Sequence, residues 1–126
     1  MNITILCVGQ IKEKYFRDAI AEYQKRLSRY CKLQMIEVAD EKTKENASEA
    51  ENDLIRKKEG ERLLKHIKDS DYCITLEIDG KMLTSEGLSK EIDRLGLAGK
   101  SSLVFVVGGS IGFDTAVLKR SALALS

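Results

Sequence analysis

A chain of 126 residues is long enough for one domain with a real core, and short for an enzyme that builds its whole site alone. Its 21 basic and 20 acidic residues leave a net charge of +1, so overall charge gives no general attraction to nucleic acid or membrane. With a single histidine, imidazole-rich zinc sites and Ser-His-Asp triads cannot be assembled convincingly, and the three cysteines show no CxxC spacing.

The first predicted elements are two strands separated by a helix. Ile3 to Val8 is a short apolar run that ends at Gly9, which predicts a buried strand and is too short for a signal peptide or a membrane span. Between residues 13 and 30 apolar side chains recur three and four apart, which predicts a helix with one buried stripe. Residues 33–38 are less uniformly apolar, as expected for a strand nearer an edge.

Two features of this first part bear on chemistry. The polar face that starts at Lys12 carries six basic side chains with tyrosines between them, a pattern that is more often a solvated face than an RNA contact. The cysteines lie in or beside predicted strands, which indicates reduced core residues of a cytosolic protein rather than catalytic thiols; they are Cys7, Cys31 and Cys73.

The middle of the chain predicts a mobile polar loop over residues 39–50 and then a helix. Ser48 is a suitable N-cap for this helix, which we expect to reach Ile67 with His66 partly exposed near its end. The expected inward residues are Leu54, Ile55, Leu63, Leu64 and Ile67, and a short basic cluster is formed by Arg56, Lys57 and Lys58.

Residues 72–78 alternate between two faces and lead into Asp-Gly-Lys, which predicts a strand followed by a turn at residue 79. Thr84 or Ser85 then caps a helix through about Leu95, with Leu88 and Ile92 also facing inward. Near the end of the chain, Asp114 predicts a cap for a short helix, and residues 122–126 predict the start of a further strand.

The most informative stretch is Ser102 to Phe113. Six mostly apolar residues predict a strand at the centre of a parallel sheet, and Gly108 and Gly109 follow at its carboxyl end. Ligands of open parallel sheets bind beyond the carboxyl ends of the strands, where bare backbone can approach them and Ser110 adds a hydrogen-bonding group. A tight strand-to-helix turn also needs glycine when it binds nothing, so this pattern alone leaves both interpretations open.

Strands separated by helices predict a parallel sheet covered on both sides, an α/β fold in one domain over residues 1–126. The G-G-S-I-G stretch lacks the G-x-G-x-x-G spacing of dinucleotide sites, and the phosphate-loop motif is absent. If the strands that end at Leu76 and Gly108 are neighbours, an apolar side chain and bare backbone meet there. Such a site suits a flat, partly apolar ligand such as an adenosine moiety.

Several segments, in this order and spacing, resemble the RlmH family: VGQIKEKYFRDAIAEYQKRLSRY, KEGERLL, LEIDGKMLTSEGLS and FVVGGSIGF. Members of this family are methyltransferases of the SPOUT class that use S-adenosylmethionine to methylate N3 of a pseudouridine in large-subunit ribosomal RNA. The resemblance implies a parallel α/β-knot fold and a cytoplasmic homodimer in which both protomers contribute to each site. By position, Leu76 and Gly108 match residues that contact the cofactor, and Gly109 and Ser110 adjoin them.

The resemblance also implies a continuation that these residues do not contain. Family members proceed into a loop with Phe-Pro-His, an arginine-bearing helix and a Tyr-His tail, which form the knot and the rest of the site. We therefore expect the domain to be C-terminally incomplete, with its open sheet face packed against a second copy and weakened cofactor affinity. No residue is assigned as catalytic base, and no metal site is expected.

Two other hypotheses remain. A shortened homologue without catalytic activity would act as a ribosome-binding or partner-binding module through the basic helix that starts at Lys12. An unrelated flavodoxin-like nucleotide binder has no specific support in the sequence, and bound flavin colour would favour it.

Overall fold

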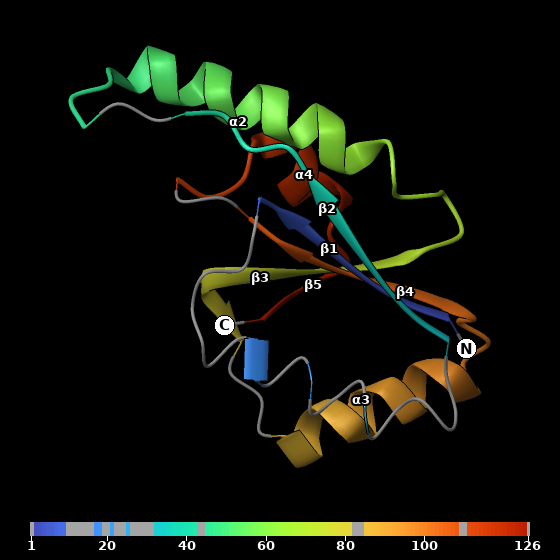
Figure 1. The fold of residues 1–126 in the computed structure, drawn as a ribbon. Helices are drawn as coiled ribbons and strands as arrows, with labels where there is room; N and C mark the ends of the chain where they lie inside the picture. Colours follow the sequence, from blue (N-terminus) through green and yellow to red (C-terminus); the bar gives the residue numbers. More distant parts are fainter. Residues whose placement is uncertain are drawn as a thin grey trace.

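The computed structural model contains a five-stranded sheet with helices on both faces (Figure 1). It describes residues 2–9, 17, 18, 21, 25, 32–42, 45–81, 85–108 and 111–125. The strand order is β2-β1-β4-β3-β5, and every pair of neighbours is parallel. The α/β parallel-sheet fold expected from the sequence is therefore confirmed.

The strands are β1 (Asn2–Val8), β2 (Lys32–Val38), β3 (Tyr72–Lys81), β4 (Ser102–Val107) and β5 (Leu123–Leu125). The helices are α2 (Glu49–Leu64), α3 (Ser85–Leu97) and α4 (Thr115–Arg120). The predicted central strand is β4, with two strands on each side, and the less apolar β2 lies at an edge as expected. Of the helix predicted over residues 13–30, residues 17, 18, 21 and 25 are helical, and the rest lies outside the described residues.

Alternate residues of the central strands build two cores, one on each face of the sheet. Val104 and Val106 of β4 pack with Leu63 and Val117 on the face that α2 and α4 cover (Figure 1). Leu103 lies on the opposite face, in a cluster completed by Ile3, Ile92 and Leu95. Because successive side chains of a strand point to opposite faces, a continuously apolar strand is required where both faces are covered.

Two of the three helix caps predicted from side-chain chemistry are present; for the third, Thr84 lies outside the described residues and Ser85 is the first residue of α3. The Ser48 hydroxyl accepts a hydrogen bond from the N–H of Glu51 at 3.1 Å, and the Asp114 carboxylate accepts one from the N–H of Ala116 at 3.4 Å. Each side chain satisfies a main-chain N–H that the first helical turn leaves unpaired. These caps fix where α2 and α4 begin.

Three local expectations are wrong. Helix α2 ends at Leu64 rather than Ile67. Leu54 is 54% exposed, because it lies on the side of α2 opposite the buried Glu59, Gly60 and Leu63. Strand β3 continues to Lys81 instead of ending in a turn at residue 79, but its pairing with β5 shifts register between Leu76 and Lys81.

Candidate functional site

The candidate site lies at the carboxyl ends of the two strands β3 and β4. Leu76 is paired with Val107 in their parallel register, so Gly108 directly follows the partner of Leu76. Leu76 also pairs with Leu125 of β5 and is half-buried. The structure therefore brings together the apolar side chain and the bare backbone that the sequence assigned to one site. Gly109 and Ser110 lie outside the described residues.

Gly108 is needed here for space and not for an unusual backbone conformation. A Cβ placed on Gly108 would lie 3.1 to 3.3 Å from three ring atoms of Phe113, and Gly108 is not among the described glycines with positive φ. Gly112 does have a positive φ of 85°, which favours glycine at the turn before Phe113. The bare face of Gly108 is thus filled by the ring of Phe113, while its main-chain groups stay at the end of β4 beside Leu76.

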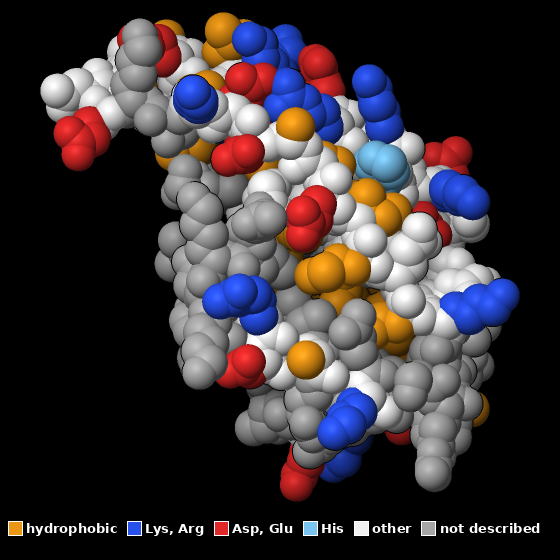
Figure 2. All heavy atoms as spheres, in the orientation of Figure 1, with side chains coloured by type: hydrophobic (Ala, Val, Ile, Leu, Met, Phe, Trp, Pro, Cys, Tyr) orange, Lys and Arg blue, Asp and Glu red, His pale blue; other side chains and the backbone are white. Residues whose placement is uncertain are grey.

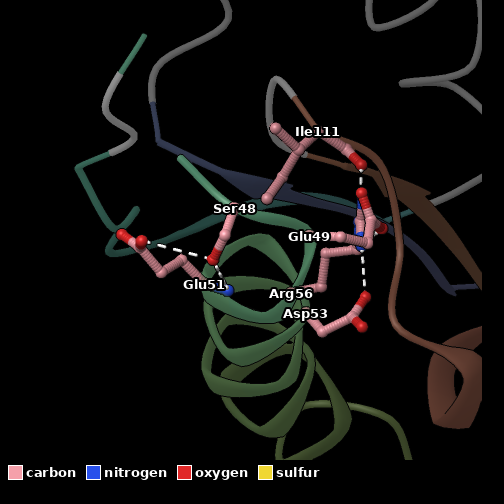
Figure 3. Close-up of polar contacts among 6 residues, drawn as sticks. All are labelled: Ser48, Glu49, Glu51, Asp53, Arg56 and Ile111. Carbon is pink, nitrogen blue, oxygen red and sulfur yellow. Dashed lines mark hydrogen bonds and ion pairs between the residues drawn. The ribbon is translucent and has the colours of Figure 1, made fainter. Parts of the chain in front are cut away.

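Helix α2 contacts the segment after β4 through Arg56 (Figure 3). The Arg56 Nε–H donates to the carbonyl oxygen of Ile111 at 2.9 Å. The Arg56 Nη1 group contacts Asp53 Oδ1 at 2.6 Å and Glu49 Oε1 at 3.2 Å, both on the same helix. The sequence placed Arg56 in a short basic cluster and gave no sign of this contact, because 55 residues separate the two partners.

A second polar group lies at the carboxyl ends of β1 and β2. The N–H of Gly9 donates to the carbonyl of Val38 at 2.8 Å, and a Cβ on Gly9 would lie 3.3 Å from Asp40 Cγ. From α2, Arg62 pairs with Glu41 and donates to the carbonyl oxygen of Ala39 at 2.9 Å. Helix α2 therefore holds the chain after β2 as well as the chain after β4.

Glu59 is buried beside this group, with only 4% of its surface exposed. Its Oε2 accepts a hydrogen bond from the N–H of Glu41 at 3.0 Å, and its Oε1 has no partner among the described residues. Burial raises the pKa of the Glu59 carboxyl above its usual value, and the nearby Asp40 adds to the effect, while the Glu41 N–H opposes it. The sequence analysis assigned no role to Glu59.

The described residues offer few groups for acid–base or nucleophilic chemistry. Cys7 and Cys73 are fully buried, and burial raises the pKa of both thiols, which disfavours the reactive thiolate. His66 is exposed in the turn after α2. Within the described part of the chain there is no group of three side chains able to hold a metal ion. What these residues supply at the ends of β3 and β4 is an apolar side chain, Leu76, beside the bare main chain of Gly108.

The surface over α2 carries charges of both signs. Lys and Arg side chains are interspersed with Asp and Glu there, so no continuous basic surface is visible on this face (Figure 2). Among the described residues, no helix is long and apolar enough to span a membrane.

Comparison with known proteins finds one family and several named relatives that match all or nearly all of this chain. The family described as "Predicted SPOUT methyltransferase" matches residues 1–126. A Clostridium botulinum protein named ribosomal RNA large subunit methyltransferase H is 58% identical over 121 residues, covering 96% of this chain and 76% of that protein. Proteins of the same name from Clostridium kluyveri and Bifidobacterium adolescentis are 54% and 56% identical, covering 76% and 79% of their own lengths.

Proposed function

This chain belongs to the SPOUT methyltransferase family, and we propose that it serves in the S-adenosylmethionine-dependent methylation of N3 of a pseudouridine in large-subunit ribosomal RNA. The names of its relatives specify large-subunit ribosomal RNA and methyl transfer. The position of the modified atom and the identity of the methyl donor are parts of the proposal.

The observation that carries the proposal is the pairing of Leu76 with Val107, which sets Gly108 beside Leu76. In this site the half-buried Leu76 side chain would pack against the adenine ring, and the main chain from Gly108 onward would supply hydrogen bonds. We assign Gly109 and Ser110 to the same site. The crevice beyond the carboxyl ends of parallel strands is where open α/β sheets bind ligands.

The reaction requires that a proton leave N3 while the acceptor nitrogen is aligned with the donor's methyl group. Holding the two reactants in line removes much of the entropic cost of a bimolecular reaction. The residues of this site would orient the donor and exclude water from it. A positioned base would lower the barrier further, and we do not assign that role to a described residue.

We further propose that the working unit is a homodimer in which a second copy completes each site. The relatives are longer than the region they share with this chain, which covers 76% to 79% of their lengths. A wall built from Leu76 and Gly108 alone leaves the ligand open on its other side, so a complete pocket requires further surface. Sedimentation of the chain with and without S-adenosylmethionine tests this point.

The proposed function is tested by binding and by transfer. Calorimetric titration with S-adenosylmethionine and transfer of labelled methyl groups to large ribosomal subunits would be compared for the unchanged chain and for Leu76→Gln. The matched control is Leu97→Gln, since Leu97 is 91% exposed and ends α3 shortly before the amino end of β4, whereas the site lies at the carboxyl ends of the strands. We expect Leu76→Gln to weaken donor binding by about tenfold, because the lost apolar contact is of the order of 1.4 kcal/mol. We expect the control to bind as the unchanged chain does.

Other outcomes decide between the alternatives. Donor binding that is equal in both variants would show that the site is misplaced. Ribosome binding without donor binding or transfer would favour a module that docks on the ribosome without catalysis.

A further inference from the structure

We propose that Arg56 is a positioning residue for the donor site, because it holds the chain after β4 in place from the side of α2. This inference rests on the proposed function, because the proposed function makes the chain after β4 part of the donor site. Arg56 does not itself form the wall built from Leu76 and Gly108, and it acts through the main chain of Ile111.

The contact is directional and partly shielded from water. The Nε–H of Arg56 donates to the Ile111 carbonyl at 2.9 Å, and the Arg56 side chain is 20% exposed. Asp53 and Glu49 hold the Nη1 side of the same guanidinium at 2.6 and 3.2 Å (Figure 3). Two carboxylates therefore fix the orientation of the planar group, and its Nε–H points at the Ile111 carbonyl.

This contact lies between two other points that anchor the same segment. At one end the ring of Phe113 packs against the bare face of Gly108. At the other end Asp114 caps α4 and lies close to Gly60 of α2. Arg56 is thus the polar anchor in the middle of a turn that contains a glycine with positive φ, Gly112.

An anchored segment binds a ligand better than a free one. Glycine-containing turns lose much conformational freedom when they become ordered, and a ligand that must order them binds more weakly. If Arg56 holds the Ile111 carbonyl before binding, the turn at Ile111 and Gly112 is already in place. Arginine is suited to this role, because its fork donates to a carbonyl and to carboxylates at once, whereas lysine offers a single flexible ammonium.

The test uses two variants of Arg56 and one control in the full chain. Arg56→Gln removes the charge, and Arg56→Lys keeps the charge but loses the Nε–H in its fixed direction. Lys57→Gln removes a charge from the next position of α2, where the side chain is exposed. Hydrogen exchange of the main chain over residues 111–114 is measured for all four proteins without ligand, followed by titration with S-adenosylmethionine.

We expect both Arg56 variants to speed exchange over residues 111–114 by about tenfold, with the rates of β1 and β4 unchanged. We expect donor affinity to fall by about tenfold in both variants, because a hydrogen bond from a charged donor is lost. In methyl transfer this loss should raise KM for the donor and leave kcat unchanged. Lys57→Gln should match the unchanged protein in every measurement.

The results separate this inference from the proposed function. Unchanged exchange over residues 111–114 in Arg56→Gln would overturn the positioning role whether or not the chain binds the donor. Faster exchange in a chain that does not bind S-adenosylmethionine would support the anchoring and overturn the proposed function. Full recovery by Arg56→Lys would also overturn the inference, since charge alone would then suffice. If Arg56→Gln fails to fold, Arg56→Lys carries the same comparison.

Discussion

Glu59 of α2 holds the main-chain N–H of Glu41 in a 3.0 Å hydrogen bond, although 18 residues separate the two. The carboxylate is 4% exposed, and only one of its two oxygens has a partner among the described residues. A buried acid in this position ties the chain after β2 to α2 and leaves a charge that is poorly compensated. Stability should therefore depend on the protonation of Glu59.

Replacement of Glu59 by Gln should change how stability depends on pH. Burial raises the pKa of Glu59 in the folded protein, so the folded state binds this proton more tightly than the unfolded state does. Its stabilising contribution is present at low pH and is lost as pH rises through the folded pKa. Urea denaturation across the acid-to-neutral range should show that Glu59→Gln gains free energy of unfolding relative to the unchanged protein as pH rises.

Glu61→Gln, at an exposed position of the same helix, is the control. Parallel pH profiles for Glu59→Gln and the unchanged protein would contradict the prediction.

Gly60 allows α2 to approach α4 closely. A Cβ on Gly60 would lie 3.1 Å from Asp114 Cβ and 3.2 Å from Cγ2 of the fully buried Val117. Alanine favours a helix interior over glycine by about 1 kcal/mol, but overpacking a core costs roughly 1–3 kcal/mol. We expect Gly60→Ala to lower the free energy of unfolding by about 1 kcal/mol in chemical denaturation.

The matched control for Gly60→Ala is Gly96→Ala, at an exposed position of α3 with no positive φ. It should be neutral or stabilising by up to about 1 kcal/mol. Equal effects of the two substitutions would show that the packing of α2 on α4 is not tight.

Gly108→Ala should weaken donor binding through Phe113. The added methyl group would meet the Phe113 ring at 3.1 to 3.3 Å, so either the ring or the end of β4 must move. We expect titration with S-adenosylmethionine to show affinity reduced by about tenfold. This loss corresponds to about 1.4 kcal/mol, which is within the usual cost of overpacking. The smaller side chain of Phe113→Leu should restore part of the affinity in the double variant. A double variant no better than Gly108→Ala would place the effect elsewhere.

Arg120 of α4 forms hydrogen bonds to the turn before β3. One terminal nitrogen, Nη2, donates to the carbonyl oxygens of Lys68 and Asp71, both at 2.7 Å. Because hydrogen bonds from a charged donor contribute about 1.5–3 kcal/mol, Arg120→Met should lower the free energy of unfolding by about 2 kcal/mol. Lys119→Met, at the exposed neighbouring position, should change it little. Thermal or urea unfolding that does not distinguish the two variants would refute the assigned role.

Much of the fold followed from patterns along the chain. The uninterrupted apolar run of β4 predicted a central strand because only a strand covered on both faces buries every side chain. The caps Ser48 and Asp114 were predictable because a short polar side chain before a helix accepts from its first N–H groups. Leu54 was predicted inward because it is apolar, but the buried side of α2 is the one that carries Glu59, Gly60 and Leu63, and Leu54 lies opposite it.

The candidate site was predicted only in part. The sequence analysis placed Leu76 beside Gly108 only if β3 and β4 are neighbours. The parallel pairing of β3 with β4 confirms that they are. Their roles toward the donor stay predictions, as do those of Gly109 and Ser110. The contacts of Arg56 and Glu59 could not be predicted from the sequence. A charged residue of a helix that bonds to a distant main-chain group looks the same in the sequence as one that faces solvent.

The sequence by itself determined the order of strands and helices, where α2 and α4 begin, and the family, because hydrophobic periodicity, caps and motif spacing are local properties of the chain. The tertiary structure decided which strand ends meet, that Phe113 fills the space beside Gly108, and that α2 holds the chain after β2 and the chain after β4. Those relationships join residues far apart in the chain, and their geometry exists only once the sheet has assembled.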